Sequence, residues 1–315
     1  MNTISIDLGG SRVKMAVISD GKVMRRTSIE SHSERGLKPL LPELEAVCRE
    51  WMADIPTEAV GFAFPSLVDV RNKKILGHNG KYPDFAAVDL ERWAMEALQL
   101  PMVIENDANA AALGEGRYGS AAGAQNFVLM ILGTGIGTAA VMDGRLIRGK
   151  HFQAGVMLGH TPLKKDGRPC AGCPGVGCAE AQASTWALAH MVSESGVPSP
   201  LKQEKHIDFQ LLKQYWEQGD PLAASIFEEC CAYFANCLIT LVYAYDPELI
   251  VLSGGVTHWG PALTDNVIRR VKERVWTPWG ELTFRMADDP DSSVLLGLHA
   301  LCVDESHKAD NRFSL

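Results

Sequence analysis

Two stretches of the chain share one pattern of apolar runs and turns, and this repeat constrains the fold more than any other feature. The first stretch starts at Thr3 and reads TISIDLGGSRVKMAVISDGKVMRR, and the second starts at Asn126 and reads NFVLMILGTGIGTAAVMDGRLIRG. In each, an apolar strand, a glycine-rich turn, a second strand, an Asp-Gly pair and a third strand follow in order. Asp-Gly between apolar runs is typical of a β-hairpin, because a type I′ turn needs positive φ at both central residues. Each stretch therefore predicts a three-stranded antiparallel meander.

The repeat has two interpretations. Short strand patterns recur by chance, so the stretches could be two unrelated pairs of hairpins, or they mark a duplicated domain. After the first stretch, the sequence predicts helices over 37–53 and 90–98, strands over 59–64 and 101–106, and a helix that begins at Asp107. After the second, it predicts helices over 179–195 and 221–245 and a strand over 248–255. Strands followed by helices, twice over, predict an α/β protein and favour duplication.

Small residues in GRYGSAAGA, near residues 117–124, mark the expected boundary between two domains. We expect an N-terminal domain over 1–118, joined by a C-terminal helix within about 293–315, and a C-terminal domain over 119–292. The polar, proline-bearing segment 197–208 is expected to be a surface connection. A chain of 315 residues suits two domains, because single cores stop growing at roughly 250 to 300 residues.

The net charge of the chain and its N-terminal sequence predict which partners it binds and where in the cell it lies. A formal net charge of −8 without a dense Lys/Arg run argues against nucleic acid and anionic membranes as partners. The chain opens on an alternating apolar stretch instead of a basic leader, and no apolar run reaches about 18 residues. We therefore expect a cytoplasmic protein with no membrane partner. Five of the eight cysteines have apolar or helical neighbours and are expected to be buried thiols, namely Cys48, Cys230, Cys231, Cys237 and Cys302.

A carboxylate and two glycines follow the first expected strand. Asp7 ends the strand, and Gly9, Gly10 and Ser11 form the turn after it. Glycine lets the backbone approach a phosphate closely, while Ser11 and free amides donate hydrogen bonds to its oxygens. Alone, this pattern more often marks only a turn. The second stretch repeats these ingredients in the equivalent place, at Gly133, Thr134, Gly135, Ile136 and Gly137. Two such loops facing each other across a cleft would hold a triphosphate.

A dinucleotide-binding fold is the main alternative for glycine-rich loops. Its motif is G-x-G-x-x-G before a helix, whereas the spacing here is G-x-G-x-G and a strand is expected to follow. We therefore set that alternative aside.

The segment ENDANAAALGE, from Glu105 to Glu115, ends a strand and begins a helix. Its polar residues therefore lie at the carboxyl edge of the sheet, where ligand sites of α/β proteins gather. Asp107 has two interpretations: a helix N-cap, a position that Asp favours, or the base that accepts a hydroxyl proton during phosphoryl transfer. The neighbouring carboxamide of Asn106 and the two glycine-rich loops favour the base.

A histidine and three cysteines form the pattern H-x9-C-x2-C-x4-C. The residues are His160, Cys170, Cys173 and Cys178. Buried thiols near a histidine are the alternative, but RPCAGCPGVGC is too rich in Gly and Pro to form a core. Four nitrogen and sulfur ligands at this spacing are typical of a closed, tetrahedral structural zinc site. Glu180 follows the last cysteine by two residues and is expected near the metal.

These segments, in this order, resemble the ROK family of bacterial sugar kinases and repressors over nearly the whole chain. DLGGS resembles the family's first phosphate loop, ENDANAAALGE its catalytic segment, and LGTGIGT its second phosphate loop. GH followed by CAGCPGVGCAE resembles its zinc and sugar segment, and DPELIVLSGGV its nucleotide-side strand. The resemblance implies two actin-like (ribonuclease H-like) domains that close on ATP and a sugar.

The resemblance also implies roles for particular residues. Asp107 would be the base for a sugar hydroxyl, and Asn79, Asn106, His160 and Glu180 would bind the sugar, with His160 also a zinc ligand. The residues implied to bind ATP are Asp7, Gly9, Gly10, Ser11, Gly133, Thr134, Gly135, Gly254 and Gly255. The implied activity is phosphorylation of a hexose or hexose derivative on a primary hydroxyl. It would use ATP and Mg²⁺, in a homodimer that carries structural zinc.

Three positions depart from the family's pattern. The residue three before His160 is Met157, where the family has a carboxylate that holds sugar hydroxyls. The cysteine pattern is one residue longer than usual, and Pro65-Ser66 replaces the usual Pro-Gly of the sugar loop. These departures leave kinase chemistry in place and argue against glucose as the substrate.

Two other functions belong to proteins of this kind. A repressor of the family would need a DNA-binding helix-turn-helix ahead of the first domain, and the phosphate loop here begins at Asp7, so such a domain is not expected. A catalytically inactive sugar sensor or regulatory protein is the other alternative. Asp107 argues against it.

Overall fold

The computed structural model describes residues 1–77 and 80–311, which form two units. Of the described residues, the first unit comprises Met1–Gly123, Arg148–Gln153 and 288–311, and the second comprises Ala124–Ile147 and Ala154–Ala287. The chain thus leaves the first unit within the small-residue segment near residue 120. The brief return of residues 148–153 to the first unit has no signal in the sequence.

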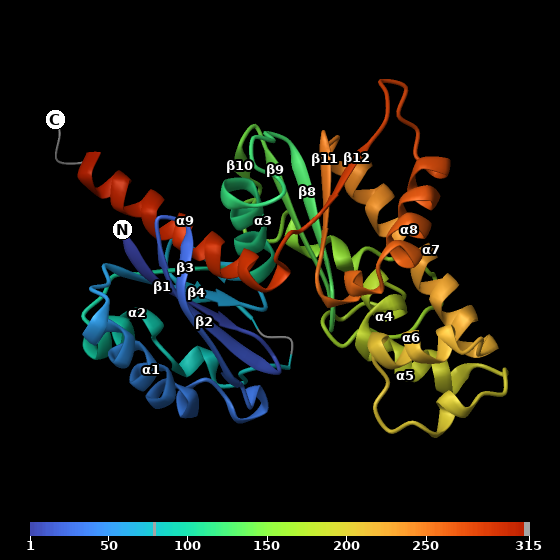
Figure 1. Cartoon of the computed structure of the whole chain (residues 1–315), viewed down its shortest axis with the longest axis horizontal. Coiled ribbons are helices and arrows are strands. Elements are labelled where there is room, and N and C mark those ends of the chain that lie inside the picture. Colours follow the sequence, from blue (N-terminus) through green and yellow to red (C-terminus); the bar gives the residue numbers. More distant parts are fainter. Residues whose placement is uncertain (78–79, 312–315) are drawn as a thin grey trace. The chain divides into compact units, whose positions relative to one another are not determined.

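A five-stranded sheet of order β3-β2-β1-β4-β7 forms the centre of the first unit (Figure 1). Its strands are β1 Asn2–Leu8, β2 Arg12–Ser19, β3 Lys22–Glu30, β4 Ala59–Phe64 and β7 Met102–Asn106. β1 pairs antiparallel with β2 and parallel with β4, and β4 pairs parallel with β7. Because β1, β4 and β7 run in one direction, Asp7 and Asn106 lie at the same carboxyl edge of the sheet. A short hairpin, β5 Val68–Asp69 and β6 Lys74–Ile75, follows β4.

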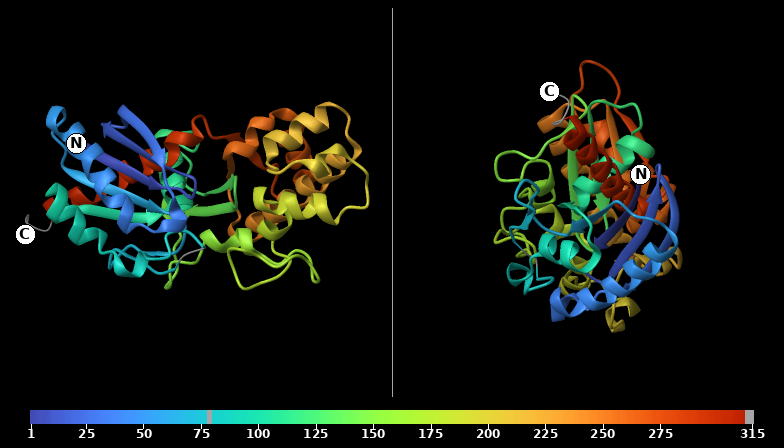
Figure 2. Two further views of the ribbon diagram at one scale, coloured as in Figure 1. Left: turned by 90° about the horizontal axis from the view of Figure 1, so that it is seen from below. Right: turned by 90° about the vertical axis from the view of Figure 1, so that its left-hand side faces the viewer.

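Helices cover both faces of this sheet (Figures 1 and 2). They are α1 Leu41–Asp54, α2 Leu90–Trp93 with the π-helical turn η4 Ala94–Leu98, α3 Asp107–Tyr118 and α9 Pro290–Asn311. On one face, Ile4 and Ile6 of β1 pack in a core with α1 and α2. On the other, Ala16 and Ile18 of β2 pack with Leu295 of α9. The alternation of side chains along the strands thus builds a helix, sheet, helix arrangement.

Glycines bring α3 and α9 into direct backbone contact. A Cβ on Gly114 would lie 2.0 Å from the carbonyl oxygen of Ser293, and a Cβ on Gly297 would lie 1.7 Å from that of Ala110. A larger residue at either position would force the two helices apart. The helix expected over 293–303 is therefore present and longer than expected.

The second unit has a sheet of the same order and the same strand directions. Its order is β10-β9-β8-β11-β12. The strands are β8 Phe127–Leu132, β9 Ile136–Met142, β10 Arg145–Leu146, β11 Leu249–Ser253 and β12 Thr283–Met286. As in the first unit, an antiparallel meander continues through two parallel strands. This match confirms the predicted α/β class and the duplication.

Both Asp-Gly turns have the backbone that the sequence predicts. Asp20 and Gly21 have φ of 48° and 76°, and Asp143 and Gly144 have φ of 51° and 69°. Positive φ at both central residues is the type I′ requirement.

The helices of the second unit pack mainly around one long helix, α7. They are α4 Ala179–Ala183, α5 Thr185–Glu194, α6 Phe209–Glu217, α7 Pro221–Tyr245 and α8 Pro261–Arg274. By length and composition alone α7 could span a bilayer, but 56% of its most apolar window is buried inside the protein. Its buried face packs with β8 and β11 in the core of the unit. We therefore describe α7 as a core helix.

The single helix predicted over 179–195 is wrong, because the chain breaks at Ser184. Ser184 is extended, with φ of −94° and ψ of 171°. The break lets Thr185 donate hydrogen bonds to the carbonyl oxygen of Gly133, from its hydroxyl at 2.8 Å and from its amide at 3.2 Å. The predicted surface connection over 197–208 contains a short 3₁₀ helix, η6 Pro200–Gln203, with Leu201 buried.

Candidate functional site

The turn between β1 and β2 is the first predicted phosphate loop, residues 9–11. The carbonyl oxygen of Gly9 accepts a hydrogen bond from the hydroxyl of Tyr82 at 2.8 Å. The carbonyl oxygen of Gly10 accepts one from the hydroxyl of Ser31 at 2.5 Å. Because donors engage these carbonyl groups, the loop does not present unpaired carbonyl oxygens to an anion.

Asn106 and Asp107 lie where β7 passes into α3. The side-chain oxygen of Asn106 accepts from the amide of Asn109 at 3.1 Å, so Asn106 is the N-cap of α3 and the N-cap interpretation of Asp107 is wrong. Oδ1 of Asp107 accepts from the amide of Ala108 at 2.8 Å and from Nδ2 of Asn106 at 2.9 Å. The same Nδ2 donates to the carbonyl oxygen of Ser66 at 3.2 Å. One oxygen of Asp107 is thus held in place by two donors.

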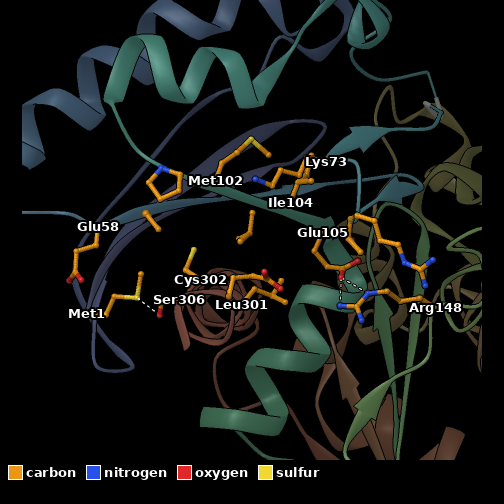
Figure 3. Close-up of a pocket in the computed structure, with 16 residues that line it drawn as sticks. Met1, Glu58, Lys73, Met102, Ile104, Glu105, Arg148, Leu301, Cys302 and Ser306 are labelled. Carbon is orange, nitrogen blue, oxygen red and sulfur yellow. Dashed lines mark hydrogen bonds and ion pairs between the residues drawn. The ribbon is translucent and has the colours of Figure 1, made fainter. Parts of the chain in front are cut away.

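Glu105, the residue before Asn106, orients this segment through hydrogen bonds. No role was assigned to it from the sequence. The residue is 1% exposed, and Oε1 accepts from the amide of Asn106 at 2.9 Å and from Nδ2 of Asn109 at 3.0 Å. Oε2 accepts from Nε and Nη2 of Arg148 at 2.8 and 2.6 Å (Figure 3). A buried carboxylate with four donors fixes the backbone before Asp107. Arg148 belongs to the returning segment 148–153, which explains why sequence spacing could not reveal the pair.

A cavity of about 700 Å³ opens beside β7 and α9 in the same unit (Figure 3). Met102, Ile104, Leu301 and Cys302 are among its lining residues, and the Glu105–Arg148 pair lies at one end. None of the predicted site residues that the structure describes lines it. The cavity is therefore distinct from the predicted substrate site.

The carboxyl groups of Asp7 and Asp107 lie close enough to influence each other. Burial, followed by the charge of Asp107, raises the pKa of Asp7 to about 7, although Lys14 and Lys81 oppose the shift. Burial also raises the pKa of Asp107, opposed first by Lys81 and then by the hydrogen bond from Ala108. Paired carboxyl groups with perturbed pKa values are common in active sites, because catalysis needs groups that titrate near the working pH.

The raised pKa of Asp7 predicts a stability change in Asp7→Asn. The folded protein holds this proton more tightly than the unfolded chain, so the wild type loses stability as the pH rises from about 4 to about 7. The neutral Asn has no such loss. We expect the ligand-free variant to exceed the wild type in free energy of unfolding by about 2 to 4 kcal/mol near pH 8, with no gain near pH 4.

Urea unfolding at the two pH values measures this difference. Asp54→Asn is the control, because Asp54 is an exposed partner of Arg25 and its loss should change stability by less than about 1 kcal/mol at both pH values. An Asp7→Asn variant that is no more stable than the wild type near pH 8 would contradict a raised pKa at Asp7.

The second predicted phosphate loop lies between β8 and β9. Gly133 is anchored through its carbonyl oxygen by Thr185 at the start of α5. Gly254, at the end of β11, has φ of 93°, and a Cβ there would lie 2.3 Å from the carbonyl oxygen of Leu132. Only glycine fits such a close approach. The structure therefore brings the two predicted glycine segments of this unit together, with Thr134 and Gly255 exposed.

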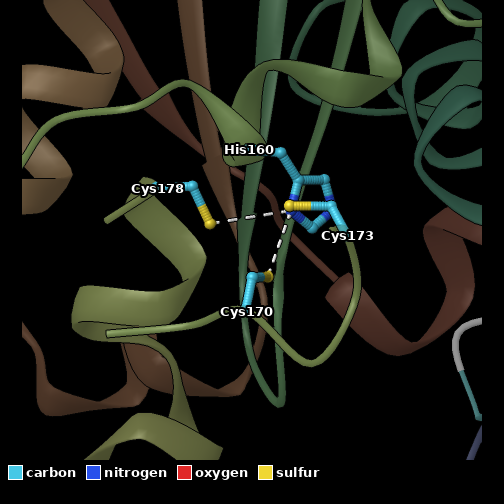
Figure 4. Close-up of side chains that lie close together, drawn as sticks. All are labelled: His160, Cys170, Cys173 and Cys178. Carbon is cyan, nitrogen blue, oxygen red and sulfur yellow. Dashed lines mark hydrogen bonds between the residues drawn. The ribbon is translucent and has the colours of Figure 1, made fainter. Parts of the chain in front are cut away.

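The four predicted metal ligands converge in the second unit (Figure 4). Their donor atoms all lie within 4.8 Å of one another. Nδ1 of His160 lies 3.5 Å from Sγ of Cys170 and 3.8 Å from Sγ of Cys178, and Cys173 completes the cluster. A tetrahedral zinc ion with bonds of about 2.3 Å to sulfur and about 2.0 Å to nitrogen places such donors about 3.5 Å apart. The residues therefore fit a Cys₃His zinc site.

Glu180 joins this cluster to the second phosphate loop. Its Oε2 accepts from the amide of Ile136 at 2.9 Å, and its Oε1 lies 3.8 Å from Sγ of Cys170. A Cβ on Gly135 would lie 2.3 Å from Oε2, so glycine is required beside this carboxylate. Glu180 is thus positioned by both the loop and the cysteine segment.

The remaining predicted positions are placed as follows. Asn79 lies outside the described residues. Met157 is half-buried in the 3₁₀ helix η5, Val156–His160, three residues before His160. Ser66 follows β4 and contacts Asn106 through its carbonyl oxygen.

Two units with the same sheet order and helices on the sheet define the class of protein, an actin-like α/β fold with a glycine-rich loop after the first strand of each unit. A sequence model of the ROK family matches residues 3–305. The chain belongs to the ROK family.

Three relatives show the range of similarity. A glucokinase from Thermotoga maritima is 28% identical over 84% of this chain and 84% of its own length. The crystal structure of a ROK family glucokinase from Streptomyces griseus, in complex with glucose and AMPPNP, has a TM-score of 0.82 at 25% identity, over 96% of this chain and 99% of that chain. A xylose repressor from Bacillus spizizenii is 25% identical over 88% of this chain and 70% of its own length. Kinases and a regulator thus share this fold.

Proposed function

We propose that the chain transfers the γ-phosphoryl group of ATP to a primary hydroxyl of a hexose or hexose derivative, with Asp107 as the base. The kinases among its relatives make the chain a sugar kinase. The observation that carries the finer assignment is the carboxylate of Asp107. It is held by two donors and lies close enough to Asp7, at the first phosphate loop, to raise the pKa of Asp7.

The chemistry needs one proton acceptor. As the sugar hydroxyl oxygen forms a bond to the γ-phosphorus, the bond to the oxygen bridging the β- and γ-phosphates breaks, and ADP leaves. The hydroxyl proton passes to Asp107, whose Oδ1 is fixed by Ala108 and Asn106, so that Oδ2 can accept it. Burial raises the pKa of Asp107, which makes it a better proton acceptor than an exposed carboxylate.

The other predicted residues have binding roles in this proposal. Asn79, Asn106, His160 and Glu180 bind the sugar, with Asn106 also orienting Asp107. The glycine loops bind ATP, which arrives with Mg²⁺ as the substrate complex. Zinc, held by the Cys₃His cluster, would fix the segment that carries Glu180. We further propose a cytoplasmic homodimer.

Sugar-dependent ADP release tests the proposed function. The purified chain is incubated with MgATP and a panel of hexoses, epimers, ketoses, deoxy sugars and amino-sugar derivatives. We expect at least one sugar to raise ADP release far above the rate without sugar. Equal ADP release with and without every sugar would contradict a sugar kinase.

Met157 predicts which sugars are poor substrates. It stands where the family has a carboxylate, and a thioether cannot accept a strong hydrogen bond from sugar hydroxyls. A buried hydroxyl without a partner costs about 1 to 3 kcal/mol, a roughly tenfold to hundredfold loss. We expect glucose to have a lower kcat/KM than another sugar of the panel, and Met157→Glu to raise kcat/KM for glucose about tenfold or more.

The control for this variant is Met95→Glu, which places the same charge at an exposed methionine of the first unit. It should leave kcat/KM for all sugars unchanged. If glucose is the best substrate of the wild type, or if Met157→Glu fails to improve it, the role given to Met157 is wrong.

A catalytically inactive sugar sensor is the second candidate, favoured by the similarity to a xylose repressor. A sensor needs to bind sugar but has no use for a positioned base. Sugar binding without sugar-dependent ADP release would support it. The held carboxylate of Asp107 favours the kinase.

A further inference from the structure

Lys81 lies directly against the first phosphate loop. A Cβ on Gly10 would lie 2.5 Å from Cε and 3.1 Å from Nζ of Lys81, so the lysine side chain occupies the space that glycine leaves open. Because Gly10 has no side chain, the Lys81 ammonium group can lie beside the backbone that would approach a phosphate.

The next residue anchors Lys81 in this position. Tyr82 is fully buried, and its φ of 51° is in the left-handed region that a bulky residue rarely adopts. Its hydroxyl donates to the carbonyl oxygen of Gly9, and its amide donates to that of Ser33 at 2.8 Å. Both carboxylate oxygens of Asp84 accept backbone amides, those of Leu37 and Lys38, at 2.5 and 2.9 Å. These hydrogen bonds hold Tyr82 in a strained backbone conformation. Such strain is common in residues that position a functional side chain.

The charge of Lys81 lowers the pKa of both Asp7 and Asp107 relative to the effect of burial alone. It opposes the rise in pKa of Asp7, and it is the strongest influence that lowers the pKa of Asp107. Two other lysines of this unit form direct ion pairs, Lys14 with Asp291 at 2.5 Å and Lys73 with Glu91 at 2.5 Å. Within residues 1–77 and 80–311, Lys81 forms no such pair with a carboxylate. Its positive charge therefore acts on both the first phosphate loop and Asp107.

We propose that the Lys81 ammonium group binds the γ-phosphoryl group of ATP as it passes from the first phosphate loop to the sugar hydroxyl at Asp107. This inference rests on the proposed function and adds a catalytic residue to it. Lys81 lies against the loop and its charge acts on the base, so a cation fixed there can stabilise the negative charge that develops during transfer.

The role of Lys81 involves no proton transfer. The hydroxyl oxygen bonds to phosphorus, the bond from phosphorus to the bridging oxygen breaks, ADP carries away the electron pair, and Asp107 takes the hydroxyl proton. Lys81 remains an ammonium group throughout. It also lowers the pKa of Asp107, which favours the ionised form of the base.

Lys81→Met tests the inference in the whole chain. With the best sugar of the panel, we expect kcat to fall about 10²- to 10³-fold, the typical effect of removing one charge-stabilising donor, with KM for the sugar nearly unchanged. Lys81→Arg, which keeps the charge, should recover most of the loss. The acid limb of the pH profile of Lys81→Met should move to higher pH, because Asp107 loses the cation that lowers its pKa most.

Calorimetric binding gives a readout that does not depend on turnover. Lys81→Met should lose affinity for a non-hydrolysable ATP analogue about tenfold or more and keep its affinity for ADP, because only the γ-phosphate reaches Lys81. Lys73→Met is the control, since it removes a lysine of the same unit that is paired with Glu91, and it should change neither quantity.

Turnover tests the proposed function, whereas the two nucleotide affinities test the role of Lys81. A wild type that phosphorylates no sugar contradicts the proposed function, and the two nucleotide affinities still decide the role of Lys81. Equal losses of ADP and ATP-analogue affinity, or a Lys81→Met variant within threefold of wild-type kcat, overturn the inference. Loss of ATP-analogue affinity alone, with rescue by Arg, supports it.

Discussion

Asp107→Asn is expected to lower kcat by about 10²- to 10⁴-fold while sugar affinity stays nearly constant. Asn keeps the size of the side chain and can still accept hydrogen bonds at its carbonyl oxygen, but it cannot take the hydroxyl proton. The donors from Ala108 and Asn106 that hold Oδ1 remain available. Steady-state kinetics and sugar binding by calorimetry, measured on the same preparations, separate lost chemistry from lost binding.

The pH profile of the wild type tests the same assignment. Burial raises the pKa of Asp107, and the base must be ionised to act, so activity should fall with decreasing pH at a higher value than for an exposed aspartate. Asp54→Asn, which changes an exposed carboxylate, should keep wild-type kcat. Near-normal turnover of Asp107→Asn would mean that another group is the base.

Removal of zinc is the second change with a large expected effect. The purified chain should contain about one zinc ion per chain, and Cys178→Ser should lose it together with most of the activity. Four-ligand sites of this kind contribute to folding directly, so we expect the melting temperature of the variant to fall by several degrees or more. Cys178 is also the N-cap of α4, where its Sγ accepts from the amide of Ala181, and serine can keep that cap, so the expected losses come from the metal.

Metal analysis and thermal unfolding measure these effects. Cys302→Ala is the matched control, because Cys302 is a buried thiol of the first unit outside the cluster. It should keep zinc at the wild-type ratio. A metal-free preparation of the wild type that is folded and fully active would contradict a structural zinc site.

Local patterns were sufficient to predict much of the fold. The Asp-Gly pairs at residues 20–21 and 143–144 fix two hairpins through backbone φ, and the apolar run over 59–64 is a strand with the predicted bounds. The long apolar helix α7 also has the predicted bounds. These features are determined by neighbours in the sequence, so sequence reasoning could reach them.

Features that depend on distant partners were missed. The strand β12 has two exposed residues among its four and is held by parallel pairing with β11, which leaves little apolar alternation to detect. The helices α6 and α8 are amphipathic and complete the core around α7, but neither was predicted. The break at Ser184 exists because Thr185 bonds to Gly133, a partner far away in the sequence. Tertiary contacts outweigh local propensity at such places.

In the candidate site, too, local spacing could be predicted from the sequence and contacts between distant residues could not. The spacing of His160 and the three cysteines was enough to predict a cluster, and the structure brings the four donor atoms together. The sequence could not show that Asn106 caps α3 or that Arg148 pairs with Glu105, because both depend on side-chain geometry. The position of Lys81 against Gly10 likewise needed the structure.

The identity of the product tests the central claim most directly. The wild-type chain is incubated with MgATP and the sugar that gives the fastest ADP release, and the products are examined by mass spectrometry and by phosphorus–proton correlation NMR. The account predicts one ADP for each sugar phosphate formed, with the phosphate on the primary hydroxyl and no product from Asp107→Asn under the same conditions. A sugar that is recovered unmodified while ADP accumulates, or a product phosphorylated elsewhere, would contradict the account.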